Sequence, residues 1–206
     1  MTSAIQKTSH PSLRWRVVDI AVASVIGVVS SLIFWAAALL WNVIGTPMES
    51  VIPGLSGLLN GLWLFAGPLA AIIVRKPGAA VYAEVVAAVL EAILGNAWGI
   101  STLYIGLVQG AMAEIAFLIF MYRSWNLAVS ALSGLLAGIG CWGYTFFTNL
   151  QAIDWGGSYG FINLLTTIIS GVVVAGVLMW NLYIAIARTG ALDRFASGRD
   201  VRGMTA

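Results

Sequence analysis

The sequence contains little charge. Only 9% of its 206 residues are Asp, Glu, Lys or Arg, whereas roughly a quarter of residues are charged in an ordinary soluble domain. Hydrophobic residues make up 60% of the chain, and the mean hydropathy is +0.95. This composition predicts an integral membrane protein. The length suits one compact helical bundle, so we expect a single membrane domain over residues 1–206.

Cysteine and histidine are almost absent. The single cysteine, Cys141, excludes a disulfide within the chain, and the single histidine, His10, lies in a polar tail. No Cys/His cluster therefore has the spacing of metal ligands. The sequence also lacks a GxxxxGK[ST] phosphate loop, which excludes ATP hydrolysis by that route. We predict no metal, no cofactor and no catalytic residue, and a protein that is driven by a partner or by an ion gradient.

Long apolar runs, in contrast, are abundant. A helix needs about 20 apolar residues to cross a bilayer, and six segments approach or exceed this length. Pro47 and Pro53 follow the first of them, so residues 45–56 are predicted to form an exposed loop. The expected fold is all-α, with six transmembrane helices at about 17–44, 57–74, 78–94, 102–122, 126–148 and 161–187, between tails at 1–16 and 188–206.

The positive charges predict the orientation of these helices. All ten Lys and Arg residues fall in the two tails, in the connection 75–77 or at Arg123, and the other three connections contain none. Loops rich in Lys and Arg stay on the cytoplasmic side. Both termini are therefore predicted to be cytoplasmic, in a multi-pass protein of the plasma membrane.

Three glutamates lie inside the third and fourth apolar segments, which contain no Lys or Arg: Glu84, Glu91 and Glu114. Ionisable groups within a membrane span usually mark a functional site. At 1.5 Å per residue, Glu91 lies roughly 6 Å and Glu84 roughly 16 Å below the outer end of their helix. On the next helix, Gln109 lies roughly 10 Å and Glu114 roughly 18 Å deep. The pattern predicts a polar wall below an outer mouth, with Glu84 level with Glu114, for a cationic or strongly hydrogen-bonding ligand.

Each glutamate also has a structural explanation. A protonated carboxyl can hydrogen-bond a neighbouring helix, and Gly106 and Gly110 on the face of Glu114 favour such close packing there. An acid at the bilayer centre costs roughly 2.5–3.5 kcal/mol, so three on two helices are hard to explain by packing alone.

Aromatic residues are frequent in the outer half of the predicted bundle. Aromatic residues near the membrane surface commonly form an interfacial belt. Trp98 follows the acidic helix and lies beside Asn96, so it is the best candidate for a ring that stacks on a ligand. The predicted ligand-binding set is Glu84, Glu91, Asn96, Trp98, Gln109, Glu114, Trp63, Tyr144 and Asn163.

Small residues repeat at a spacing of four in the first helix, at Ala23, Gly27 and Ser31. This pattern lets another helix approach closely, from within the chain or from a partner. The fifth helix has the same spacing at Ser130, Gly134 and Gly138, so the pattern is not unique.

With these motifs in view, the chain resembles the YkoE-type S component, the substrate-binding subunit of an energy-coupling factor (ECF) transporter. The resemblance covers the whole six-helix layout. It is most specific in Arg75-Lys76-Pro77-Gly78-Ala79-Ala80, Glu84, Glu91, Leu94-Gly95-Asn96, and Val108-Gln109-Gly110 followed by Ala113-Glu114.

The resemblance implies thiamine or its hydroxymethylpyrimidine precursor as the ligand. It also implies a membrane coupling subunit and two cytoplasmic ABC ATPases as partners. Ala23, Gly27 and Ser31 would then face the coupling subunit, and residues 45–56 would form a lid over the ligand.

Two other functions fit the residues alone. The first is a proton-coupled carrier for a cationic small molecule, in which Glu84 and Glu114 relay protons. The second is a structural protein whose glutamates only bind helices together.

Overall fold

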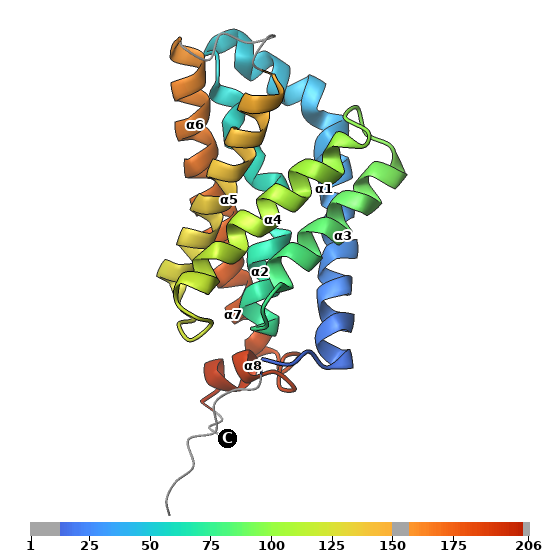
Figure 1. Ribbon diagram of the computed structural model, residues 1–206, viewed down its shortest axis with the longest axis vertical. Coiled ribbons are helices and arrows are strands. Elements are labelled where there is room, and N and C mark those ends of the chain that lie inside the picture. The colour runs from blue at the N-terminus through green and yellow to red at the C-terminus, as the bar shows by residue number, and fades with distance from the viewer. Residues whose placement is uncertain (1–12, 150–156, 204–206) are drawn as a thin grey trace, which may run out of the picture.

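The computed structural model describes residues 13–149 and 157–203, which form a bundle of helices (Figure 1). The all-α prediction is confirmed for these residues. The predicted tail up to residue 12 and most of the predicted connection 151–160 lie outside them. The elements are α1 (Val17–Val51), the 3₁₀-helix η1 (Leu55–Trp63), α2 (Ala66–Val74), α3 (Ala79–Leu94), α4 (Ser101–Ile119), α5 (Leu127–Thr148), α6 (Ser158–Ser170), the π-helical segment η2 (Gly171–Leu178), α7 (Met179–Arg188) and α8 (Ala196–Val201).

Five helical stretches of the described residues are long and apolar enough to cross a membrane: Val17–Val51, Leu55–Val74, Ser101–Ile119, Leu127–Thr148 and Ser158–Arg188. The remaining predicted span, 78–94, corresponds to α3, which has 16 residues. Its length of roughly 24 Å is less than the hydrocarbon thickness of a bilayer, about 30 Å. The count of six crossings therefore stays a prediction.

Helix α1 continues to Val51, seven residues beyond its predicted end, so the prediction of a loop over 45–56 is wrong for 45–51. Pro47 removes one backbone donor, a loss that helices within a membrane tolerate. The side chain of Glu49 helps to end the helix, because it accepts hydrogen bonds from the backbone N–H of Gly54, at 2.7 Å, and from the hydroxyl of Ser56. The connection between α1 and η1 is therefore only Ile52–Gly54.

The second predicted helix, 57–74, is divided into η1 and α2 by a break at Leu64 and Phe65. All nine residues of α2 are buried, so this helix forms the centre of the bundle. Hydroxyl groups of α6 accept hydrogen bonds from one backbone N–H and one side-chain amide of η1. Ser170 Oγ accepts from Gly61 N–H at 2.9 Å, and Thr167 Oγ1 accepts from the amide of Asn60 at 2.8 Å. Irregular backbone at membrane depth requires partners of this kind.

The small residues of α1 pack against α3 rather than facing outward. Ala23, Gly27 and Ser31 are all buried, and a Cβ on Gly27 would lie 2.7 Å from Val86 Cγ1 and 3.0 Å from the carbonyl oxygen of Ala83. The spacing thus correctly predicts a close helix contact. That this face meets a coupling subunit stays a prediction.

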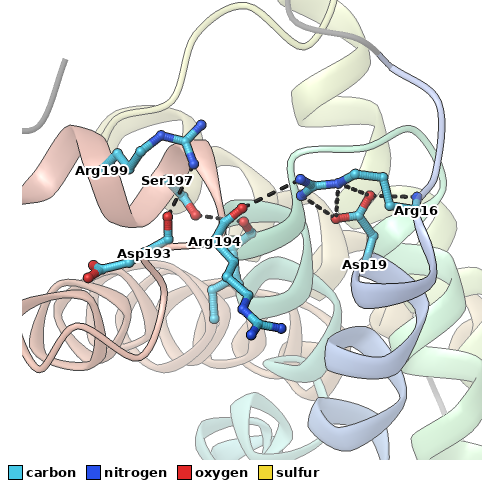
Figure 2. A network of polar contacts seen from close by, with 7 residues as sticks. Arg16, Asp19, Asp193, Arg194, Ser197 and Arg199 are labelled. Atoms are coloured by element: carbon cyan, nitrogen blue, oxygen red, sulfur yellow. Dashed lines mark hydrogen bonds and ion pairs between the residues drawn. The ribbon is translucent and has the colours of Figure 1, made fainter. Parts of the chain in front are cut away.

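Both described chain ends lie at one end of the bundle, where the start of α1 meets α8 (Figure 1). Figure 2 shows the polar contacts there: Arg16 forms an ion pair with buried Asp19 at 2.8 Å and donates to the backbone oxygen of Arg194 at 3.5 Å. Ser197 Oγ donates to the backbone oxygen of Ile73 at 2.7 Å. The segment after α7 is thereby attached to the ends of α1 and α2. Which side of the membrane this end faces remains a prediction from the charges.

Candidate ligand-binding site

The structure has a cavity of about 500 Å³. Its lining residues include Trp98, in the connection between α3 and α4, and Tyr159, at the start of α6. Both of these segments lie at the end of the bundle opposite α8 (Figure 1). Helices α1, η1, α3, α4, α5 and α6 and the connection between α3 and α4 contribute side chains to the wall of the cavity. The volume is in the range of small-molecule sites. Six of the nine predicted ligand-binding residues line it: Trp63, Glu91, Trp98, Gln109, Tyr144 and Asn163.

Three tryptophans form one part of the wall, and we refer to Trp41, Trp63 and Trp98 as the tryptophan cluster. The ring centroids are 5.9 Å apart for Trp41 and Trp63, 6.1 Å for Trp41 and Trp98, and 5.8 Å for Trp63 and Trp98. The interplanar angles lie between 71° and 90°, so the rings meet edge to face. Electron-rich aromatic surface of this kind attracts cations.

Glu91 carries a carboxyl oxygen without a partner beside this cluster. The side chain is 1% exposed, and its Oε1 accepts a hydrogen bond from Trp63 Nε1–H at 3.1 Å. Its Oε2 has no hydrogen-bond partner within residues 13–149 and 157–203. Because a buried carboxyl oxygen is costly when unpaired, the wall of this cavity favours a guest that supplies a donor or a positive charge.

Amide and hydroxyl groups supply the other polar parts of the wall. Gln109 and Asn163 are both buried and reach the cavity from α4 and α6, and Asn60 and Ser56 reach it from η1. An amide side chain offers both a donor and an acceptor. The cavity can therefore pair with the edge of a polar heterocycle as well as with a cation.

Glu114 lies away from the cavity. Its carboxylate accepts hydrogen bonds from the backbone N–H groups of Gly78 and Ala80, both at 2.8 Å, and from the hydroxyl of Tyr122 at 2.7 Å. Burial and this bond raise the pKa of Tyr122, which follows the end of α4. Glu114 thus holds the first turn of α3. This contact matches the structural role, a hydrogen bond to a neighbouring helix, that the sequence left open for each glutamate.

Glu84 and Asn96 also lie outside the wall of the cavity. Glu84 is 1% exposed and faces Gly67 and Gly110, rather than lying level with Glu114 as predicted. Asn96 Oδ1 accepts from the backbone N–H groups of Trp98 and Gly99, at 3.1 and 2.8 Å. Asn96 therefore shapes the loop that presents Trp98.

Comparison with known proteins agrees with this architecture. The family model for the "ABC-type cobalt transport system, permease component" matches residues 18–140. The putative HMP/thiamine permease protein YkoE of Bacillus subtilis (strain 168) is 32% identical over 193 residues, or 91% of this chain and 92% of that protein. A crystal structure of an S-component of an ECF transporter matches with a TM-score of 0.83 and 31% identity, over 92% of this chain and 94% of that one. The chain belongs to the family of ECF S components.

As an S component, the protein is a substrate-binding membrane subunit that crosses the membrane several times. It belongs to a class of transport proteins and not of enzymes. S components bind a small-molecule vitamin and work with an energy-coupling module.

Among the described residues, no group of three or more His, Cys, Asp or Glu side chains could hold a metal ion.

Sequence reasoning missed several wall residues of this S component. Trp41 is absent from the predicted set, although it lies in the tryptophan cluster. Asn60 was passed over, although it is a polar residue in an apolar segment, three positions before Trp63. Ser56 and Tyr159 carry no distinguishing pattern and lie at the wall because of tertiary packing.

Proposed function

We propose that this S component binds thiamine or its hydroxymethylpyrimidine precursor in the cavity. The observation that carries the proposal is the unpaired Oε2 of Glu91, buried in the wall beside the tryptophan cluster. The curated relative named as an HMP/thiamine permease supports the same ligands.

The chemistry of thiamine matches the two kinds of wall. Its thiazolium ring is permanently cationic, so it would be attracted by the carboxylate of Glu91 and by the faces of Trp63 and Trp98. A desolvated cation on an aromatic face gains about 0.5–2 kcal/mol. Its aminopyrimidine has donor and acceptor atoms on one edge, which suit the amides of Gln109 and Asn163.

The proposal includes the transport partners. The S component would deliver its ligand by associating with a membrane coupling subunit that two ABC ATPases drive. The distribution of Lys and Arg supports cytoplasmic termini, in which case the cavity at the opposite end opens to the outside. Ligand would enter from there.

Calorimetry on the purified chain in mild detergent tests the ligand. Thiamine and hydroxymethylpyrimidine should each bind as one equivalent. Glu91→Gln should weaken thiamine about tenfold or more, because removing the charge leaves the cation without its counter-charge, at a cost of about 1.5–3 kcal/mol. The uncharged pyrimidine should lose much less. If neither compound binds the parent chain, the proposed ligands are wrong.

A further inference from the structure

Helix α3 contacts the end of η1 and the start of α2 through two residues that lie seven positions apart on one face of α3. Glu91 accepts the hydrogen bond from the side chain of Trp63, the last residue of η1. Glu84 accepts a hydrogen bond of 2.6 Å from the backbone N–H of Gly67, the second residue of α2. One helix thus fixes both sides of the break at Leu64 and Phe65.

The contact at Glu84 satisfies a backbone group that has no other acceptor in its own helix. Gly67 lies in the first turn of α2, where N–H groups lack intrahelical partners. The carboxylate also lies at the positive end of the helix dipole. Space is tight there, because a Cβ on Gly67 would lie 3.1 Å from Glu84 Oε2. The other oxygen, Oε1, has no partner among the described residues.

The break itself lacks the regular hydrogen bonds that would hold it. Leu64 N–H donates to Gly61 at 3.3 Å, and the α-helical pattern resumes where Leu69 N–H bonds to Phe65 at 3.1 Å. Only three residues separate Trp63 from Gly67. The position of the Trp63 ring therefore depends on where the start of α2 is held.

We infer that Glu84 is a positioning residue of the ligand site: its bond to Gly67 sets the place of Trp63 against Glu91 and in the tryptophan cluster. Glu84 is not among the residues that line the cavity. The expected effect of Glu84 on thiamine affinity rests on the proposed function. The effect of Glu84 on the position of Trp63 applies to the chain without ligand as well. It replaces the prediction that Glu84 contacts the ligand.

Three variants separate positioning from ligand contact. Glu84→Gln keeps the length of the side chain and an oxygen that can accept from Gly67, so thiamine affinity should stay within about threefold of the parent. Glu84→Asp keeps the carboxyl group but withdraws it by one methylene, and Glu84→Ala removes it. Both should weaken thiamine about five- to a hundredfold, as expected when a buried donor loses its partner. The Gln and Asp variants decide the matter if the Ala variant does not fold.

The matched control is Glu114→Ala. It removes a carboxyl group that also accepts backbone hydrogen bonds, at the first turn of α3. It should lower the melting temperature but change the thiamine affinity by less than about threefold, because Glu114 does not line the cavity and bonds neither Gly67 nor Trp63.

A double-mutant cycle then tests the route through Trp63. In a Trp63→Phe background, Glu84→Asp should have little further effect on the thiamine affinity. Additive effects would overturn the inference, and so would a Glu84→Gln variant as weak as Glu84→Asp.

A readout without ligand keeps the two proposals distinguishable. In ¹H–¹⁵N spectra, the indole resonance of Trp63, assigned by its loss in Trp63→Phe, should move in Glu84→Asp in the direction that Glu91→Gln moves it. If thiamine fails to bind the parent but this shift occurs, the ligand proposal fails and the positioning role stands. An unmoved indole resonance would overturn the positioning role.

Discussion

The indole Nε1–H of Trp63 donates to Glu91 Oε1 at 3.1 Å, and this bond joins the aromatic and the acidic parts of the cavity wall. The bond uses one oxygen of the carboxylate and leaves the other unpaired. It therefore orients Glu91 while preserving its capacity to meet a ligand. The same ring packs edge to face with Trp41 and Trp98, so one side chain takes part in both features.

Trp63→Phe should weaken thiamine binding more than Trp41→Phe. Both substitutions retain an aromatic ring, but only the first removes the donor that orients Glu91. Loss of a hydrogen bond to a charged group costs about 1.5–3 kcal/mol, or roughly 10- to 150-fold in affinity. Calorimetry on the two variants checks this difference. Equal losses would mean that the bond to Glu91 contributes nothing to binding.

Gly27→Leu should destabilise the isolated chain. The added side chain would enter the contact between α1 and α3, where Val86 and Ala83 already lie within 3.0 Å of a Cβ. Overpacking of this kind costs about 1–3 kcal/mol. Thermal unfolding in detergent measures it, with Val29→Leu on the exposed face of α1 as the control. If the stability of Gly27→Leu equals that of the control, α1 and α3 are not packed as described.

Ser197→Ala should loosen the segment after α7. The hydroxyl of Ser197 is buried and donates to the backbone oxygen of Ile73, so its removal leaves that acceptor unpaired. Hydrogen exchange measured by mass spectrometry should become faster in residues 189–202. Exchange in η1 should stay as in the parent chain. Unchanged protection of the C-terminal segment would show that other contacts hold it.

Thiamine uptake should require the coupling module. Proteoliposomes that contain this chain alone should take up no thiamine under a proton gradient, because the S component only binds the ligand. Addition of a coupling subunit, two ABC ATPases and ATP should start uptake. Uptake by the chain alone under a proton gradient would favour the proton-coupled carrier that the sequence left open.

Much of the fold could be predicted from the sequence because bilayer crossing imposes long apolar runs. Composition predicted an all-helical membrane protein, and most helix boundaries lie close to the expected ones. Local rules failed where tertiary contacts decide the backbone. Pro47 indicated a loop, yet α1 continues to Val51. Nothing in residues 57–74 distinguishes a 3₁₀-helix from an α-helix before α6 supplies Ser170 and Thr167 as partners.

The candidate site was predicted only in part, because local periodicity places side chains on a helix face and tertiary contacts decide what they meet. Helical periodicity correctly placed Glu84 and Glu91 on one face of α3, but depth along an assumed vertical helix misplaced Glu114. The first turn of α3 has free N–H groups, and Glu114 meets them at Gly78 and Ala80. Trp41 reaches the cavity from a segment with no acidic motif, so only its packing reveals it.

The most direct test of the account is a structure of this chain with thiamine bound. The account predicts that the thiazolium ring lies within about 6 Å of the tryptophan ring centroids, the usual range of a cation–π contact, and close to Glu91 Oε2. Thiamine seated elsewhere, with Glu91 Oε2 facing only protein atoms, would contradict it.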